Sequence, residues 1–196
     1  MSETSPPPIS RSEQARRWWQ DLQDYKDGKP NPRADRASRA RLRRADQGAA
    51  VAEEAVMALY RRLGGEEARG FSEPRLKRAL RLALVLVHVR QDESADEQGN
   101  RKSFARQLGR ASFEDAESAR LHPLRFQRLL AARGDEEVVQ EFRRAVDLAG
   151  NKANVRDLAA MLLDWEREET RIRFAFDYYA AGTAAPKADA EPALSA

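Results

Sequence analysis

The stretch SEPRLKRALRLALVLVHV, residues 72–89, is the part of the sequence that most strongly indicates its fold. Ser72 is a favourable N-cap and Pro74 is tolerated in a first helical turn, so a helix is expected to begin here. From Leu76 onward apolar residues recur at helical spacing, and toward the end of the stretch they surround the helix almost completely. Because a helix that is apolar on every side needs other elements around it, we expect residues 72–89 to form the central helix of a bundle.

Helical patterns flank the central stretch on both sides. The expected helices cover about residues 12–25, 36–44 and 47–63 before it, and 103–111, 124–133, 135–149 and 154–179 after it. No alternating strand pattern interrupts them, which predicts an all-α fold.

The last and longest of these helices begins at Asn154, where Asp157 completes a start that resembles a capping box. Its apolar residues recur at helical spacing and are expected to face the core. They are Leu158, Leu162, Trp165, Ile172, Phe176 and Tyr179.

The helices are expected to form two small helical bundles in series. The N-terminal bundle covers residues 11–112 and the C-terminal bundle covers 118–182, with a joint around 112–118. The Pro/Ser-rich residues 1–10 and the Ala/Pro-rich residues 183–196 carry too little apolar surface to pack, so both are predicted to be disordered tails.

Composition limits the chemistry of the chain. Its 196 residues include no cysteine, which excludes disulfides, thiolate catalysis and sulfur-ligated metal sites. The first residues lack the apolar region of a signal peptide, and the apolar run 82–89 is far shorter than the roughly 20 residues that span a membrane. We therefore expect a cytoplasmic protein without membrane contact.

Candidates for catalysis are few. His88 lies in the apolar run and His122 precedes a proline, and neither belongs to a metal-binding spacing such as HExxH. Four acids of one loop are the nearest approach to a cation site, although they lack a supporting framework. These acids are Asp92, Glu93, Asp96 and Glu97. With no Gly-rich phosphate loop and no nucleophile elbow, the sequence predicts no enzymatic activity, no metal and no cofactor.

Arginines collect in windows that contain no acid. Residues 36–44, 74–91, 98–113 and 118–134 have none, although 35 basic residues nearly balance 32 acidic ones in the whole chain. A fold that brings such windows together presents a positive surface suited to a polyanion. The candidate nucleic-acid-binding residues, from these windows and from a later arginine pair, are Arg36, Arg39, Arg41, Arg43, Arg44, Arg78, Arg110, Arg125, Arg128, Arg133, Arg143 and Arg144.

Helical geometry supports phosphate contact in the first window. On a helix, Arg36, Arg39 and Arg43 share a face. Arg44 lies at the margin of that face and Leu42 points the opposite way. Guanidinium forks match phosphate oxygens bidentately. A solvated face with salt bridges to neighbouring acids would produce the same pattern, and so would an arginine excess that partly reflects a GC-rich genome.

Five segments, in this order, carry a family resemblance. They are ARLRRA at 40–45, FARQLGRA at 104–111, LRFQRLLAARGDEE at 124–137, EFRRAVDLA at 141–149 and NVRDLAAMLLDW at 154–165. Together with a Trp-containing first helix, their order and spacing resemble the CasB family, the small subunit of the type I-E CRISPR surveillance complex Cascade.

The resemblance implies a non-catalytic, two-bundle subunit that acts in antiviral defence. Two copies of such a subunit lie head to tail against the other Cascade subunits, which hold the guide RNA. Their basic surface helps to hold the opened target DNA, above all the displaced strand of the R-loop, without reading its sequence. The residues that matching motifs place on this surface are Arg41, Arg43 and Arg44 (ARLRRA), Arg110 (LGRA), Arg125, Arg128 and Arg133 (LRFQRLLAAR), and Arg143 and Arg144 (FRR).

Two other classes of protein stay open. A helical DNA-binding regulator needs a helix-turn-helix, and the nearest approach is LHPLRFQRLL at 121–130, whose arginines suit phosphates better than base edges. A purely structural adaptor needs no nucleic-acid contact at all.

Overall fold

The computed structural model describes residues 9–26, 29–32, 34–64, 70–93, 103–110 and 117–180. Most of the two predicted tails lies outside these described residues. So do most of the expected joint around 112–118 and the acids Asp96 and Glu97 of the loop considered for a cation.

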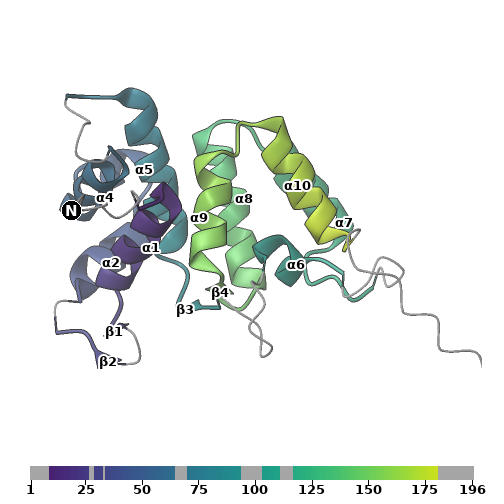
Figure 1. Ribbon diagram of the computed structural model, residues 1–196, viewed down its shortest axis with the longest axis horizontal. Helices are drawn as coiled ribbons and strands as arrows, with labels where there is room; N and C mark the ends of the chain where they lie inside the picture. The colour runs from purple at the N-terminus through teal and green to yellow at the C-terminus, as the bar shows by residue number, and fades with distance from the viewer. Residues whose placement is uncertain are drawn as a thin grey trace, which may run out of the picture.

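The described chain is built from helices, which confirms the all-α class (Figure 1). The helices are α1 (Arg11–Asp21), α2 (Arg36–Arg44), α3 (Gln47–Ala50), α4 (Glu54–Gly64), α5 (Glu73–Leu86), α6 (Phe104–Leu108), α7 (Pro123–Ala131), α8 (Asp135–Leu148), α9 (Val155–Leu163) and α10 (Glu168–Tyr178). Four two-residue strands accompany them: β1 (Tyr25–Lys26) pairs antiparallel with β2 (Lys29–Pro30), and β3 (Gln91–Asp92) pairs parallel with β4 (Lys152–Ala153).

Helix α5 is the central helix that its sequence predicts. Every residue from Ala79 to Val87 is buried. One side of α5 packs against α4, and another packs against α8 and α9 (Figure 1). The helix therefore belongs to the cores of both halves of the molecule, which form one continuous apolar cluster.

A buried arginine, Arg81, ties the two halves together from within α5. Its Nε donates to Asp135 Oδ1 at 3.0 Å, and its Nη1 donates to the carbonyl oxygen of Leu162 at 3.0 Å. Its Nη2 also pairs with Glu166. Burial opposes the charged form of Arg81, but the hydrogen bonds that Arg81 donates to Glu166 and Asp135 outweigh it and raise the pKa of the guanidinium.

Helix α6 packs against the C-terminal half, although the predicted boundary places it in the N-terminal bundle. The hydroxyl of Ser103 donates to Asp177 at 3.0 Å, and the backbone N–H of Phe104 donates to Asp157 at 2.8 Å. The backbone N–H of Arg110 donates to the carbonyl of Tyr178 at 2.9 Å. Residues 103–110 therefore belong with α9 and α10 in space.

The prediction of one long final helix is wrong. A turn between α9 and α10, at Asp164 to Arg167, separates them. Because this turn changes the rotational phase of the helix, Phe174 and Tyr178 are buried, while Ile172 is 61% and Phe176 50% exposed. A shorter break at residues 51–53 likewise divides the helix expected at 47–63 into α3 and α4.

Within the described ranges, no helix is long and apolar enough to cross a bilayer.

Candidate nucleic-acid interface

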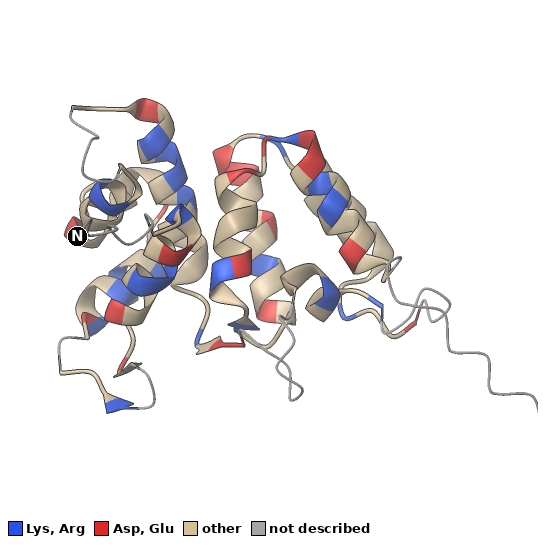
Figure 2. Cartoon of the chain, viewed as in Figure 1, with Lys and Arg blue, Asp and Glu red and all other residues tan. Residues whose placement is uncertain are grey.

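Helix α2 carries the first arginine window and is fixed to the core by Leu42, which is fully buried. The helix begins after Asp35, whose side chain accepts from the backbone N–H of Ser38 at 2.9 Å. Hydrogen bonds from Ser38 lower the pKa of the Asp35 carboxyl. With Leu42 inward, the arginines point to the edges and the outer face of the helix, and Figure 2 shows basic residues along it.

Arg36 and Arg39 share one acidic partner, Asp24. Arg39 Nη2 lies 2.9 Å from Asp24 Oδ2 and its Nη1 donates to Gln23 at 2.9 Å, whereas Arg36 pairs with the other carboxylate oxygen. The hydrogen bonds from Arg36 and then Arg39 lower the pKa of Asp24. Arg39 is therefore occupied in holding α2 to the segment after α1, while Arg36 stays 74% exposed.

Arg43 and Arg143 are half-buried and bind backbone carbonyls, contrary to the expectation of surface arginines. Arg43 Nε donates to the carbonyl of Val87 at 2.8 Å. Arg143 donates to the carbonyl of Leu84 at 2.9 Å and to that of Ala45 at 3.2 Å. Burial lowers the pKa of both guanidinium groups, and for Arg43 neighbouring arginines add to the effect. Both residues satisfy carbonyls near the C-terminal end of α5, which a helix leaves without internal partners.

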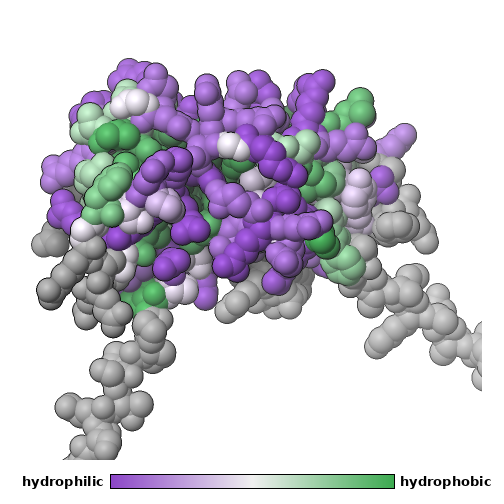
Figure 3. Space-filling model, turned by 90° about the horizontal axis from the view of Figure 1, so that it is seen from above, coloured by the Kyte–Doolittle hydropathy of each residue, from purple (hydrophilic) through white to green (hydrophobic). Residues whose placement is uncertain are grey.

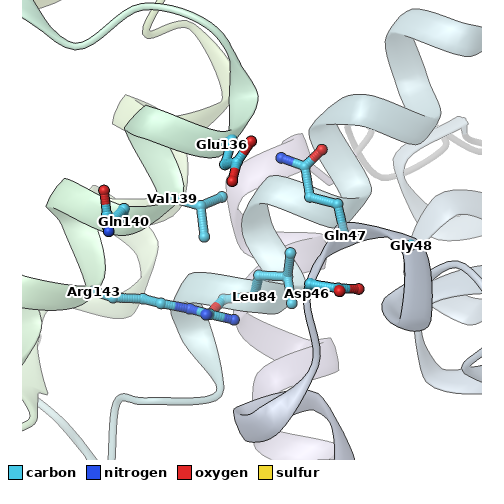
Figure 4. A pocket seen from close by; sticks show the side chains of 8 residues that line it. All are labelled: Asp46, Gln47, Gly48, Leu84, Glu136, Val139, Gln140 and Arg143. Carbon is cyan, nitrogen blue, oxygen red and sulfur yellow. The ribbon is translucent and has the colours of Figure 1, made fainter.

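The hollow beside Arg143 does not suit a phosphate. It occupies about 400 Å³ between α3 and α8. Figure 4 shows the Arg143 side chain extending from α8 toward Leu84, with Asp46 and Glu136 also on the lining. Among its described lining residues, the one arginine donates to backbone carbonyls and the two carboxylates repel an anion.

Arg41 and Arg44 lie on the exposed part of α2. Arg41 donates to both carboxylate oxygens of Glu53, at 2.8 and 3.0 Å. The hydrogen bond to Glu53 raises the pKa of the Arg41 guanidinium. Arg44 makes no side-chain hydrogen bond or ion pair with any part of the chain that the structure describes. Of the arginines in this window, Arg44 is the most available to a ligand.

The second half brings three predicted arginines around one hollow. Arg125 and Arg128 lie one turn apart on α7, and Arg144 faces them from α8. All three are exposed. Together they line a hollow of about 430 Å³, whose other lining residues are Leu121, Leu129, Glu141, Asp147 and Leu148.

The two acids of this α7–α8 hollow already have partners within α8 or just after it. Glu141 lies 2.5 Å from Arg144, and Asp147 accepts from the side-chain amide of Asn151 at 2.8 Å. Arg125 and Arg128 make no side-chain hydrogen bond or ion pair with other described residues. Their guanidinium groups are therefore available for an anion.

The remaining three candidates lie elsewhere. Arg133 folds back to donate to the carbonyls of Leu130 and Ala132, at 2.8 and 2.9 Å. Arg110 is half-buried, 5.1 Å from the centre of the Tyr179 ring. Arg78 lines a third hollow near the start of α5, which two arginines outside the predicted set also line: Arg11 and Arg75. The twelve candidates are thus spread over several sites. Arg75 lay in an acid-free window, whereas nothing in the sequence distinguished Arg11.

His122 and Asp92, two of the candidates for catalysis or cation binding, have structural partners. His122 accepts from the backbone N–H of Leu124 at 3.3 Å and so caps α7. Asp92 pairs with Arg16 at 2.7 Å and accepts from the backbone N–H at the start of α9. Burial, and next the charge of Arg143, lower the pKa of His88. No three His, Asp or Glu residues of the described ranges lie close enough together to hold a metal ion.

Comparison with known proteins supplies the family. A search of curated proteins and of solved structures found no match. The family model described as CRISPR-associated protein Cse2 matches residues 38–179, which is most of the chain. The match includes α2 from Ser38 onward, all of α3 to α10 and so both helices of the α7–α8 hollow. The protein therefore belongs to the Cse2 (CasB) family of CRISPR-associated proteins and is a small subunit of the type I-E Cascade complex.

Proposed function

We propose that this subunit binds the nucleic-acid backbone through the α7–α8 hollow and thereby stabilises the R-loop that Cascade forms on its target. The observation that carries the proposal is the convergence of Arg125, Arg128 and Arg144 on one exposed hollow. The subunit takes no catalytic part in this role, and its contacts are with the target strands and, through the other Cascade subunits, with the guide RNA in the cytoplasm.

The charge of the hollow suits phosphodiesters. Three guanidinium groups face two carboxylates, and each carboxylate is engaged by a protein partner. Arginine forks can bind two oxygens of one phosphate, which gives position without requiring a particular base. The leucines that line the hollow can contact sugars but cannot read base edges by hydrogen bonding.

Backbone contacts of this kind are sufficient for the task. R-loop formation exchanges a DNA duplex for an RNA–DNA duplex of similar stability, so a few protein contacts to the open strands shift the balance. The exposed arginines of α2 offer a second contact surface, in which Arg44 has no competing partner among the described residues and Arg36 remains largely exposed.

The proposal is tested in assembled Cascade with the triple variant Arg125→Ala, Arg128→Ala and Arg144→Ala. We expect the displaced strand to become less reactive to a single-strand probe and the R-loop to close sooner at physiological salt. Binding of isolated protein to single-stranded DNA should lose about 0.7 of the logarithmic salt slope for each phosphate contact removed.

The matched control is Arg167→Ala with Arg173→Ala, because both arginines are exposed near or on α10, away from the α7–α8 hollow. Matched levels of assembly must be verified for each complex. An R-loop lifetime in the triple variant equal to that of the control would refute the proposed role of the hollow.

A further inference from the structure

A hollow at the N-terminal end of α5 carries a concentration of positive charge that the proposed function does not use. Arg11, Arg75 and Arg78 line it together with Ser72, Leu63, Gly64 and Leu163, and none of these described lining residues is an acid. Glu73, which follows Ser72, pairs with Lys77 at 2.8 Å, and Asp164, which follows Leu163, pairs with Arg167 at 3.5 Å. The hollow measures about 210 Å³. Three guanidinium groups around one hollow attract an anion with multiple oxygen acceptors.

Tyr60 organises the surroundings of this hollow. Its ring lies under the guanidinium of Arg75, 4.5 Å from ring centre to Cζ. Its hydroxyl donates to the carbonyl of Gly70 at 3.0 Å and accepts from the backbone N–H of Ser72 at 2.8 Å. One side chain thus positions an arginine of the hollow and also closes the turn that precedes α5.

The same turn presents an aromatic ring to solvent. Phe71 lies between the two residues that the Tyr60 hydroxyl bridges, and it is 78% exposed. Gly70 permits this turn because its φ of 80° is in the left-handed region. In Figure 3, which views the molecule from the side of the α5 N-terminus, hydrophobic residues reach the surface among hydrophilic ones at the end that holds α4 and the start of α5. Phe71 directly precedes Ser72 of the hollow lining, so its exposed ring is available to stack on a flat apolar partner.

Two properties of the start of α5 add to its affinity for an anion. The N-terminal end of the helix carries a partial positive charge from its macrodipole. Ser72 occupies the N-cap position, yet its hydroxyl makes no capping hydrogen bond, so it remains able to donate to an incoming oxygen. Both properties add to the attraction that the three arginines exert on an anion.

We propose that the three arginines around the start of α5 bind a backbone phosphate of a single strand, and that the exposed ring of Phe71 stacks on an unpaired base next to that phosphate. Cationic groups that follow the backbone, combined with an aromatic ring, are what sequence-independent binding of single strands requires. The inference rests on the proposed function for the class of partner, and it adds a second site on a different part of the molecule from the α7–α8 hollow.

The test uses the full-length protein and two fluorescent probes, an oligothymidine and an abasic oligomer of the same length. Phe71→Ala should weaken binding of the oligothymidine about tenfold and leave the abasic oligomer unaffected, because only the former can stack. The matched control is Phe176→Ala, which removes an exposed phenylalanine of α10 that is not among the described residues lining either this hollow or the α7–α8 hollow.

The double variant Arg11→Ala and Arg78→Ala should lower the logarithmic salt slope for both probes by about 0.7, since one phosphate contact is lost. Arg78 is half-buried, so Arg11→Ala alone, at an exposed position, provides a variant whose fold is unaffected and whose slope should also fall. The triple variant of the α7–α8 hollow, measured in parallel, shows whether a failure concerns this site or the proposed function as a whole.

Equal loss on both probes in Phe71→Ala, or no loss on either, would overturn the stacking contact. An unchanged salt slope in the arginine variants would overturn the phosphate contact. A third outcome is that the arginine substitutions abolish binding of inorganic phosphate but leave binding of both oligomers unaffected. This result would identify the hollow as a site for a free anion and would overturn the inference for nucleic acid.

Discussion

Adjacent arginines on α8 should differ sharply in what they contribute to stability. Arg143 is half-buried and donates to two carbonyls, at 2.9 Å to Leu84 and at 3.2 Å to Ala45, whereas Arg144 is exposed and pairs with Glu141 on its own helix. Arg143→Ala removes both hydrogen bonds and leaves two carbonyls short of a donor. Arg144→Ala removes one surface ion pair.

The magnitudes follow from these contacts. A hydrogen bond from a charged donor contributes about 1.5–3 kcal/mol, and the length of the second bond and partial access of water to a half-buried site reduce the total to about 2–3 kcal/mol. For a protein of this size that corresponds to a fall in Tm of about 5–10 °C. Removal of an exposed helical ion pair costs about 0.5 kcal/mol or less.

Urea unfolding followed by far-UV circular dichroism measures both free energies of unfolding, with Arg144→Ala as the internal control. Arg143→Lys should recover part of the loss, because an ammonium group keeps the charge but cannot reproduce the fork that reaches two carbonyls. If Arg143→Ala and Arg144→Ala destabilise the protein equally, the assignment of Arg143 to an internal role is wrong.

Three further predictions concern other buried contacts. Arg81→Met should lower the free energy of unfolding by about 3 kcal/mol. This is the lower end for a broken buried ion pair, because the Glu166 side chain is 60% exposed. A urea midpoint equal to that of Lys77→Ala would contradict this prediction. Burial raises the pKa of Asp157 above its ordinary value of 3.8, so the stability that this group contributes is present below that pH and is lost as pH rises through the higher folded-state pKa. In urea titrations above pH 3.8, Asp157→Asn should therefore reduce the pH dependence of the free energy of unfolding. An unaltered pH dependence would show that other groups cause it. Gly109→Ala should destabilise the protein by about 3 kcal/mol or more, since the added Cβ would collide with the backbone carbonyl of Tyr178, and a thermal midpoint matching wild type would show that α6 can move away.

The sequence was sufficient to predict the family resemblance and the basic character. It did not show which arginines bind partners within the protein and which are exposed. Acid-free windows correctly identified where positive charge collects along the chain. They gave no information on distant acids and carbonyls. In the structure, Asp24, Glu53 and the carbonyl of Val87 bind four of the five arginines of α2. The exposed cations on α7 and α8 converge only because those helices pack side by side.

The sequence by itself determined the helical class, the central place of α5 and several helix starts, because apolar periodicity and capping depend on residues within a few positions of each other. Asn154 caps α9 as the local pattern predicts, and its side chain accepts from the backbone N–H of Asp157. Only the tertiary structure decided the placement of α6, the rotational phase of α10 and the role of each arginine. Those outcomes depend on partners far away along the chain, 98 residues in the contact between Arg143 and Ala45, and no local periodicity encodes which carbonyl will lie beside a guanidinium group.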